Sequence, residues 1–295
     1  MRKAKLHPHF FANNTLSQTA LHLALFGLGL PYEYQNPEYL NQTLTESQTV
    51  AILTLIEKRI AQRIPVEYIT QEADYLGHTF YVNEHVLVPR SIMSTRFEDF
   101  LQLVPWQNYR VLDLCTGSGC IGISLALLNS TIKVDLADIS EEALKVAKIN
   151  ITKYALGNRV KTIQSDIFEN IHEKYDLIIT NPPYVSAKDY QKIPLEFKNE
   201  PKLALESGKD GLDCIDKILM QAKNHLTPNG LLIAEVGYAS AKLIKKRYKK
   251  LPLTWFGYRR PNGKESWLAM DGIFLCQAKT LLSYSETPNF FSTLF

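Results

Sequence analysis

The chain contains little cysteine: four residues in 295, at Cys115, Cys120, Cys214 and Cys276. None belongs to a C-x-x-C pair, and a chain of this length buries a core large enough to need no disulfide. No H-E-x-x-H motif occurs, and neither Cys nor an acidic cluster accompanies His7 and His9, so no metal site is expected. These absences predict reduced thiols and a cytoplasmic protein.

Long apolar runs are also absent. The longest, Ala20 to Leu30, is interrupted by His22 and is too short to span a bilayer. Basic residues precede it, as in a signal peptide, but the run starts only after a polar segment and no small-residue cleavage site follows. It therefore predicts a buried helix, and no membrane partner is expected.

Neither sign of charge is in large excess, since 33 Lys and Arg face 30 Asp and Glu, a net charge of +3. That balance does not by itself indicate nucleic-acid binding. The segment from Lys242 to Lys264, however, holds nine basic residues and no acidic one. The rest of the chain then has 24 basic and 30 acidic residues, net −6. The segment is either a solvated helix face with a loop or a surface for an anionic partner.

The content of 45% apolar and 21% charged residues is that of a soluble globular protein, which excludes disorder, collagen and coiled coil. The first ninety residues favour helices. Thr45 and Gln48 form a capping box ahead of apolar residues at helical spacing, and Pro65 ends that helix. The segment from Tyr68 to Val88 predicts a short hairpin, and residues 96–103 predict a linking helix.

From residue 109 onward, strands alternate with helices. Apolar strands are expected at 111–114, 134–137, 160–164, 176–180 and 230–236, and helices at 120–128, after Ser140 and at 214–225. Such alternation predicts an α/β fold with a mainly parallel, doubly wound sheet. Ligands of these sheets bind beyond the carboxyl ends of the strands, so the site residues are expected in the loops that follow the strands.

A glycine-rich loop follows the first of these strands. Gly117-x-Gly119-x-x-Gly122 matches the dinucleotide fingerprint, and Asp138 lies sixteen residues beyond it, so a nicotinamide cofactor is one candidate. Asp113, ahead of the glycines, is placed to hold a cationic amino-acid group, which favours S-adenosylmethionine instead.

Acidic residues also follow the second and third strands. Asp138 would accept hydrogen bonds from ribose hydroxyls, and Asp166 from an adenine amino group. Each alone could be a cap or turn residue. A cap or turn role explains one such acid more easily than it explains acids at the ends of three consecutive strands.

The most specific motif is Asn181-Pro182-Pro183-Tyr184, after the fourth strand. It could form a rigid turn, but it is also the signature of methyl transfer to a planar amino group. The Asn181 side-chain oxygen and the Pro182 carbonyl would accept the two hydrogens of that group, and Tyr184 would stack on its plane. A glutamine amide, adenine N6 and guanine N2 all fit this description, so the loop alone leaves the acceptor open.

With these motifs in place, the sequence resembles the bacterial protein-(glutamine-N5) methyltransferases. The resemblance extends from about residue 20 to 276 and includes Glu200-Pro201, the segment 204–212, the segment 63–70 and Gly77-His78. It implies a class I S-adenosylmethionine-dependent methyltransferase, with an N-terminal mainly helical domain at 1–90 that recognises the substrate and a cofactor domain at 91–295. The predicted site residues are Asp113, Cys115, Thr116, Gly117, Ser118, Gly119, Asp138, Asp166, Ile167 and Asn181 for the cofactor, with Asn181, Pro182, Pro183 and Tyr184 for catalysis.

Within this family, Val88-Pro89-Arg90-Ser91 and the segment 195–197 resemble the branch that modifies ribosomal protein L-three rather than the release-factor branch. Ile92 and Thr95 depart from that branch, and Tyr258 to Met270 resembles an insertion. The implied partner is L-three, free or in an assembling large subunit, with ribosomal RNA near Lys242 to Lys264. Release-factor methylation, amine methylation of DNA or RNA, a non-catalytic assembly factor and an oxidoreductase remain as alternatives.

Overall fold

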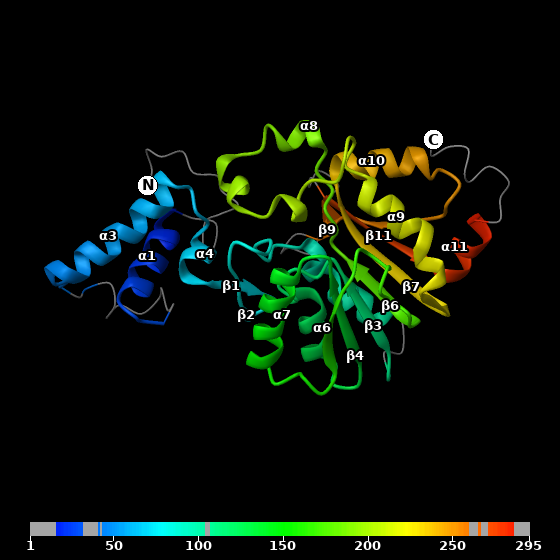
Figure 1. The fold of residues 1–295 in the computed structure, drawn as a ribbon, viewed down its shortest axis with the longest axis horizontal. Helices are drawn as coiled ribbons and strands as arrows, with labels where there is room; N and C mark the ends of the chain where they lie inside the picture. The colour runs from blue at the N-terminus through cyan, green and yellow to red at the C-terminus, as the bar shows by residue number, and fades with distance from the viewer. Residues whose placement is uncertain are drawn as a thin grey trace.

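The protein is built around a seven-stranded sheet in the order β5-β4-β3-β6-β7-β11-β8 (Figure 1). The computed structural model describes residues 16–31, 41, 43–103, 107–259, 265–266 and 271–285. β11 (Asp271–Gln277) runs antiparallel to both β7 and β8 (Thr254–Phe256). The other strands run parallel: β3 (Arg110–Leu114), β4 (Lys133–Asp138), β5 (Val160–Gln164), β6 (Tyr175–Thr180) and β7 (Leu226–Gly237). The doubly wound α/β fold predicted from the sequence is confirmed.

Helices cover both faces of this sheet (Figure 1). Ile233 of β7 packs in a core with residues of α6 (Cys120–Leu128) and α7 (Glu141–Lys153). Its neighbour Leu232 faces the opposite core, with α9 (Asp213–Gln221), α10 (Tyr238–Arg247) and α11 (Ala278–Ser285). Successive strand residues point to opposite faces, so a strand covered on both sides must be apolar almost throughout.

The strand order reverses between β3 and β6. The chain runs outward from β3 to β4 and β5, then returns to place β6 on the other side of β3, with Leu114 opposite Thr180. Loops that leave the carboxyl ends of β3 and β6 therefore diverge and open a crevice. The glycine-rich loop and the Asn181 loop follow these two strands.

Helix caps explain several element boundaries. Thr45 and Gln48 form both halves of the capping box at the start of α3 (Glu46–Ala61). Ser140 accepts a hydrogen bond from Ala143 N at 3.2 Å, and two glutamates follow in the first turn of α7. Acidic side chains there interact favourably with the positive end of the helix.

The N-terminal elements lie to one side of the sheet (Figure 1). The helix expected at 20–30 is α1 (Leu16–Gly27), which buries Thr19, Leu23 and Leu25. It begins earlier than predicted and ends before Gly29, whose positive φ of 67° is incompatible with a continuing helix. The expected hairpin is shorter than predicted. It comprises β1 (Glu72–Tyr75) and β2 (His78–Tyr81), while the residues before it form α4 (Val66–Thr70).

Asn150 of α7 attaches this hairpin to the sheet domain. Its side chain accepts from Tyr81 N at 2.7 Å and donates to Tyr81 O at 3.0 Å and to Ser118 O at 2.9 Å. The hairpin is followed by η4 (Ile92–Arg96) and by α5 (Phe97–Gln102), the linking helix expected at 96–103. Ile92 packs against the core, and Thr95 Oγ1 donates to Ile92 O at 2.8 Å. These two departures from the resemblance thus have local structural roles.

The C-terminal strands were not predicted. β8 and β11 follow α10 and form an antiparallel pair. The strand–helix alternation earlier in the sequence predicts parallel strands and does not indicate such a pair. The segment from Tyr258 to Met270 contains a short ribbon, β9 (Tyr258–Arg259) paired with β10 (Glu265–Ser266), and its other residues lie outside the described ranges. His7 and His9 also lie outside them.

Candidate active site

A cavity of about 380 Å³ opens at the carboxyl ends of the parallel strands. Its walls come from the loops after β3, β4, β5 and β6, and from residues 85–91 and 201–208. Its volume is in the range of small-molecule sites. Nine of the predicted site residues line it: Cys115, Thr116, Gly117, Ser118, Asp138, Asp166, Ile167, Asn181 and Pro183. Pro182 and Tyr184 line a small adjoining recess together with Asn181.

Asp113 lies beneath the glycine-rich loop, outside the residues that line the cavity. It is fully buried, and its Oδ2 accepts from Thr116 Oγ1 at 2.6 Å and from Gly122 N at 2.9 Å. Burial raises the pKa of this carboxyl to about 7. In the structure Asp113 holds the loop in shape, and its direct contact with a cofactor stays a prediction.

The loop itself makes a tight left-handed turn. Cys115 has φ 59°, Gly117 55° and Gly119 82°. Such a conformation strains a residue with a side chain, so the surrounding contacts must hold Cys115 in it. Gly119 lies behind the cavity wall, where a Cβ would come within 2.9 Å of Ile123 Cδ1. The turn directs Gly117 N to Asp138 Oδ2, at 2.9 Å.

Asp138 is the most constrained acid of the cavity. Its Oδ2 accepts from Gly117 N, and its Oδ1 accepts from Ser140 N at 3.0 Å. Burial raises its pKa, although these backbone donors favour the ionised form. Each carboxylate oxygen has two lone pairs, so both can still accept a hydrogen bond from a ligand hydroxyl.

The third strand-end loop contributes Asp166 and Ile167. Asp166 Oδ2 lies 3.7 Å from Lys217 Nζ, and both side chains are largely exposed. Ile167 has φ 52°, an outlier for a β-branched residue. Ser165 supports this backbone, since its Oγ donates to Ile167 O at 2.9 Å.

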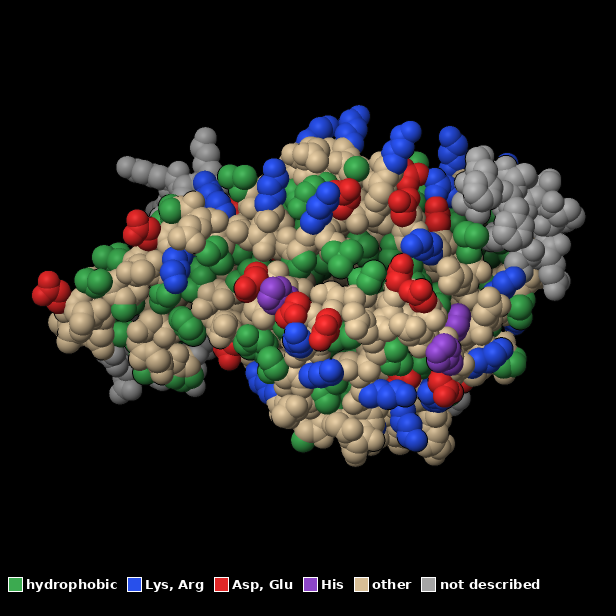
Figure 2. All heavy atoms as spheres, in the orientation of Figure 1, with side chains coloured by type: hydrophobic (Ala, Val, Ile, Leu, Met, Phe, Trp, Pro, Cys, Tyr) green, Lys and Arg blue, Asp and Glu red, His purple; other side chains and the backbone are tan. Residues whose placement is uncertain are grey.

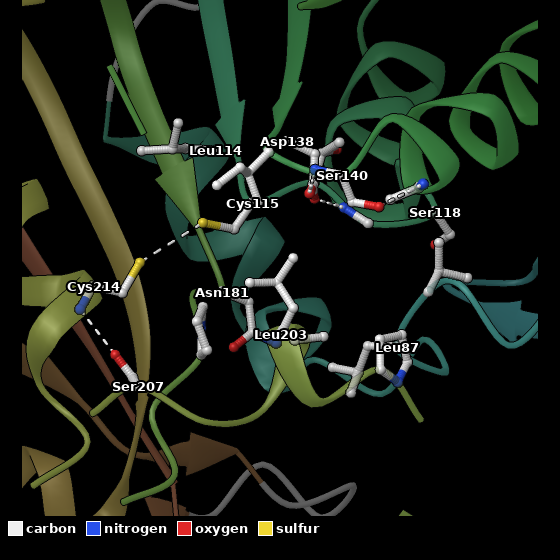
Figure 3. Close-up of a pocket in the computed structure, with 18 of the residues that line it drawn as sticks. Leu87, Leu114, Cys115, Ser118, Asp138, Ser140, Asn181, Leu203, Ser207 and Cys214 are labelled. Atoms are coloured by element: carbon white, nitrogen blue, oxygen red, sulfur yellow. Dashed lines mark hydrogen bonds between the residues drawn. The ribbon is translucent and has the colours of Figure 1, made fainter. Parts of the chain in front are cut away.

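The Asn181 loop is pinned at its start. Thr180 is the last residue of β6, and its Oγ1 donates to Leu114 O at 2.6 Å. Asn181 then turns toward the cavity (Figure 3). No donor among the described residues reaches its buried Oδ1. An unsatisfied buried acceptor costs free energy unless a ligand pairs with it, so this oxygen is a ready site for an N–H group.

Tyr184 is held from two directions. Ser240 Oγ of α10 donates to Tyr184 O at 3.0 Å. Its ring lies against Gly237, where a Cβ would come within 2.9 Å of Tyr184 Cδ2. The next residue, Val185, donates from its N to Leu205 O at 2.8 Å. The loop is therefore rigid on both sides of the prolines.

The cavity wall near α9 holds two residues that were not predicted as site residues, Cys214 and Ser207. Cys115 Sγ and Cys214 Sγ lie 4.0 Å apart across the cavity wall (Figure 3). The hydrogen bond to Cys214, together with burial, raises the pKa of the Cys115 thiol. Ser207 Oγ accepts from Cys214 N at 2.9 Å and so anchors the start of α9. Residues 99 positions apart gave no sequence signal of this contact.

Arg90 and Glu200 form a second unpredicted contact at the rim. The carboxylate accepts from both guanidinium nitrogens, at 2.5 and 2.6 Å. Both motifs had been noted in the sequence as part of the resemblance, but nothing in it paired them. Burial lowers the pKa of the Arg90 guanidinium, while the adjacent Glu200 carboxylate raises it. The net effect is a raised pKa.

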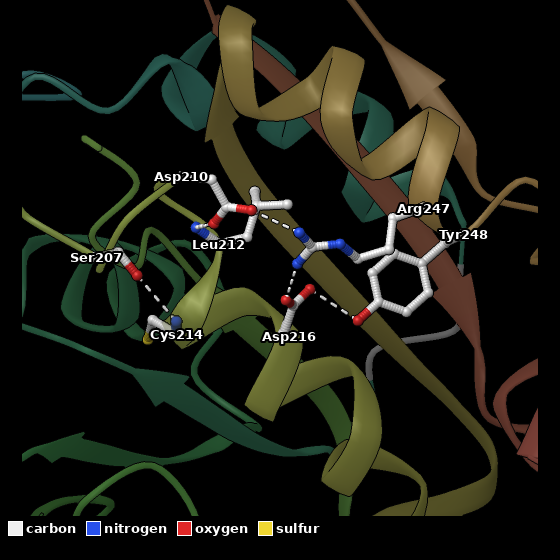
Figure 4. Close-up of polar contacts among 7 residues, drawn as sticks. All are labelled: Ser207, Asp210, Leu212, Cys214, Asp216, Arg247 and Tyr248. Atoms are coloured by element: carbon white, nitrogen blue, oxygen red, sulfur yellow. Dashed lines mark hydrogen bonds and ion pairs between the residues drawn. The ribbon is translucent and has the colours of Figure 1, made fainter. Parts of the chain in front are cut away.

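Arg247 does not belong to a free basic surface, contrary to its place among the nine basic residues. It pairs with Asp210 at 2.5 Å and with Asp216, whose Oδ1 accepts from Tyr248 OH at 2.7 Å (Figure 4). This network ties α10 to α9 and to the loop before it. The side chains of Arg259, Arg260 and Lys264 lie outside the described part of the chain.

The described ranges lack the features of a membrane-spanning or metal-binding protein. None of the helices there combines the length and apolar character that a bilayer crossing requires. Within the same ranges, no group of three or more His, Cys, Asp or Glu side chains gathers as a metal site would need.

A family model described as "Methyltransferase small domain" matches residues 97–210, which include the glycine-rich loop, Asp138, Asp166 and the Asn181 loop. The fold likeness extends to the catalytic domain of hMettl16, solved with the MAT2A 3'UTR hairpin 6. That likeness has a TM-score of 0.53 at 15% identity, over 79% of this chain and 82% of that one. Fold and site together define a class I methyltransferase.

Two relatives narrow the class. The ribosomal protein uL3 glutamine methyltransferase of Neisseria meningitidis serogroup A is 40% identical over 253 residues, 83% of this chain and 82% of that protein. The protein of the same name from Francisella tularensis subsp. tularensis is 37% identical over 273 residues, 90% and 83% of the two chains. The chain belongs to the family of ribosomal protein uL3 glutamine methyltransferases.

Proposed function

We propose that this enzyme methylates the side-chain amide nitrogen (N5) of a glutamine in ribosomal protein uL3, with S-adenosylmethionine as the methyl donor. The buried, unpaired Asn181 Oδ1 between the cavity and the recess carries the proposal. An amide NH₂ group supplies the donor that this oxygen lacks. The names of the relatives supply the acceptor protein.

The chemistry of the cavity fits S-adenosylmethionine. Gly117 of the glycine turn, Asp138 and Asp166 all line the same cavity. When bound, S-adenosylmethionine supplies an electrophilic methyl group on a sulfonium. In this cavity Asp138 would accept from ribose hydroxyls, Asp166 and Ile167 would border the adenine, and the loop 115–118 would lie along the amino-acid end.

The residues of the Asn181 loop would orient the acceptor. A glutamine amide nitrogen is a weak nucleophile because its lone pair is delocalised into the carbonyl. With Asn181 Oδ1 and the Pro182 carbonyl accepting its two hydrogens, positive charge developing on that nitrogen is stabilised. The rigid loop, held by Thr180 and Ser240, supplies the alignment that transfer in line requires. Tyr184 stacks on the amide plane.

An acceptor panel tests this function. Purified enzyme and isotopically labelled cofactor are incubated separately with uL3, with a release factor, and with ribosomal RNA or DNA. We expect label in uL3 alone. Label in nucleic acid in place of protein would contradict glutamine methylation. Label in the release factor alone would contradict the proposal that uL3 is the substrate. We also propose that the enzyme acts in the cytoplasm, as expected for a modifier of a ribosomal protein.

We further propose that the exposed lysines of α10 (Tyr238–Arg247) and of the turn after it contact ribosomal RNA beside the substrate. Lys242, Lys245 and Lys246 are exposed on α10, and Lys249 and Lys250 are exposed in the turn that follows it. Lys242 Nζ lies 4.2 Å from the Tyr238 ring centroid and Lys245 Nζ 4.5 Å from that of Trp255. Figure 2 shows Lys and Arg side chains (blue) along the upper edge formed by α8 (Ala187–Tyr190) and α10. Ser240 attaches this helix directly to the Tyr184 loop.

Reversing the charge of three of these lysines tests the RNA contact. Lys242→Glu, Lys245→Glu and Lys249→Glu together are expected to weaken binding of a ribosomal RNA fragment about tenfold or more and to flatten its salt dependence. Fluorescence anisotropy at several salt concentrations measures both. The matched control reverses the exposed Lys133, Lys148 and Lys153 on other elements. Equal loss in both triple variants would indicate a net-charge effect and contradict a localised surface.

A further inference from the structure

Residues 195–206 form a strap that joins the N-terminal helices to the active site. The strap comprises η5 (Leu195–Asn199), Glu200-Pro201, η6 (Lys202–Ala204) and the two residues after it. In Figure 1 it belongs to the segment that lies between α8 and the N-terminal elements. It has three sets of contacts, each to a different part of the protein.

The first set reaches the end of α3. Glu196 Oε1 lies 3.4 Å from Arg63 NH1 and 3.9 Å from Arg59 NH1. Both Glu196 and Arg59 are buried, which makes this a shielded interaction rather than a solvated surface pair. Asn199 Nδ2 adds hydrogen bonds to Gln62 O at 3.2 Å and to Arg63 O at 3.0 Å.

The second set reaches the loop before the cofactor domain. The Glu200 side chain is fully buried, pairs in bidentate fashion with Arg90, and accepts from Val88 N at 3.0 Å. The Arg90 guanidinium also lies over the Phe197 ring, 5.0 Å from its centroid. A bidentate Arg–carboxylate pair fixes orientation as well as distance.

The third set reaches the site itself. Pro201, Leu203, Ala204 and Glu206 line the cavity. Arg90, held by the strap, lines the small recess together with Asn181, Pro182 and Tyr184. Glu206 also forms a parallel bridge with Val185, directly after the catalytic loop.

We infer that Glu200 is a positioning residue for methyl transfer, and that the strap couples substrate recognition by the N-terminal helices to the geometry of the acceptor recess. The inference rests on the proposed function. Glu200 acts through Arg90 and Val88, which form the wall that faces the Asn181 loop. Loss of its charge would leave Arg90 without its bidentate partner and free this wall to move. A displacement on the order of 1 Å at an acceptor costs about a hundredfold in rate.

The test compares two buried glutamates of the same strap, through Glu200→Gln and Glu196→Gln. Steady-state methylation of uL3 gives kcat and KM, and calorimetric titration with S-adenosylhomocysteine reports cofactor affinity and an intact fold. Glu200→Gln is expected to lower kcat about tenfold to a hundredfold with cofactor affinity unchanged. Glu196→Gln is expected to raise KM for uL3 with little change in kcat. Arg90→Lys keeps the cation but loses the bidentate geometry. Its kcat is expected to lie between those of the wild type and Glu200→Gln.

Three outcomes separate the possibilities. Wild-type kcat and KM in both Glu200→Gln and Arg90→Lys would overturn the inference while leaving the proposed function intact. Loss of cofactor affinity in proportion to activity would also overturn it, because the strap would then act on the cofactor rather than the acceptor. A wild-type enzyme that leaves uL3 unmethylated would reject the proposed function and this inference together.

Discussion

Asn181→Ala is expected to slow methyl transfer to uL3 strongly, even at saturating cofactor. The substitution removes the buried Oδ1 that lacks a donor among the described residues. The acceptor amide would lose one of two hydrogen bonds that orient it and stabilise its developing charge. Removing one such preorganised group from an active site typically lowers kcat about a hundredfold to a thousandfold.

Single-turnover methylation with saturating cofactor measures this effect on the chemical step. The matched control is Asn224→Ala, an exposed asparagine on η7 (Ala222–Asn224), far along the sequence from the site. It is expected to behave as wild type. If Asn181→Ala kept wild-type single-turnover rates, the assignment of the acceptor site to this loop would be wrong.

Asp138→Ala is expected to remove most of the affinity for S-adenosylhomocysteine. The bound ligand would lose two hydrogen bonds from its ribose hydroxyls to the Asp138 carboxylate. Each such bond to a charged group contributes about 1.5–3 kcal/mol. The variant also loses the acceptor for Gly117 N, so the glycine turn loosens. Together these losses predict a Kd raised about a hundredfold or more.

Calorimetric titration measures that Kd directly. Asp189→Ala is the control, because Asp189 is an exposed acid in α8 whose contacts are with Ser186. Thermal melts of both variants distinguish lost binding from lost folding. Unchanged affinity in Asp138→Ala would place the ribose elsewhere in the cavity and contradict this assignment.

The sequence predicted the parts of the fold that local physics determines. Strand–helix alternation gave the five parallel strands, and the cap at Ser140 and the capping box at Thr45 marked helix starts that the structure contains. The strand-end rule brought the loops of Cys115, Asp138, Ile167 and Asn181 to one cavity. These features follow from residues that are near neighbours in the chain.

What the sequence did not reveal depends on contacts between distant residues. Arg90 and Glu200 are 110 residues apart, and Cys115 and Cys214 are 99 apart. Asp113 was itself predicted as a cofactor residue, but it lies in β3 and its side chain points beneath the loop to Gly122 N. Arg247 belongs to a basic run, yet it pairs with two acids from another helix and loop. The division into domains at residue 90 stays a prediction.

The central claim is that this chain methylates a glutamine amide of uL3. Tandem mass spectrometry of uL3, after incubation with S-adenosylmethionine and either wild type or Asn181→Ala, tests it most directly. The account predicts the added mass of one methyl group on a single glutamine with the wild-type enzyme, and no detectable addition with the variant over the same short incubation. Unmodified uL3 with both, from a wild-type protein that binds S-adenosylhomocysteine, would contradict it.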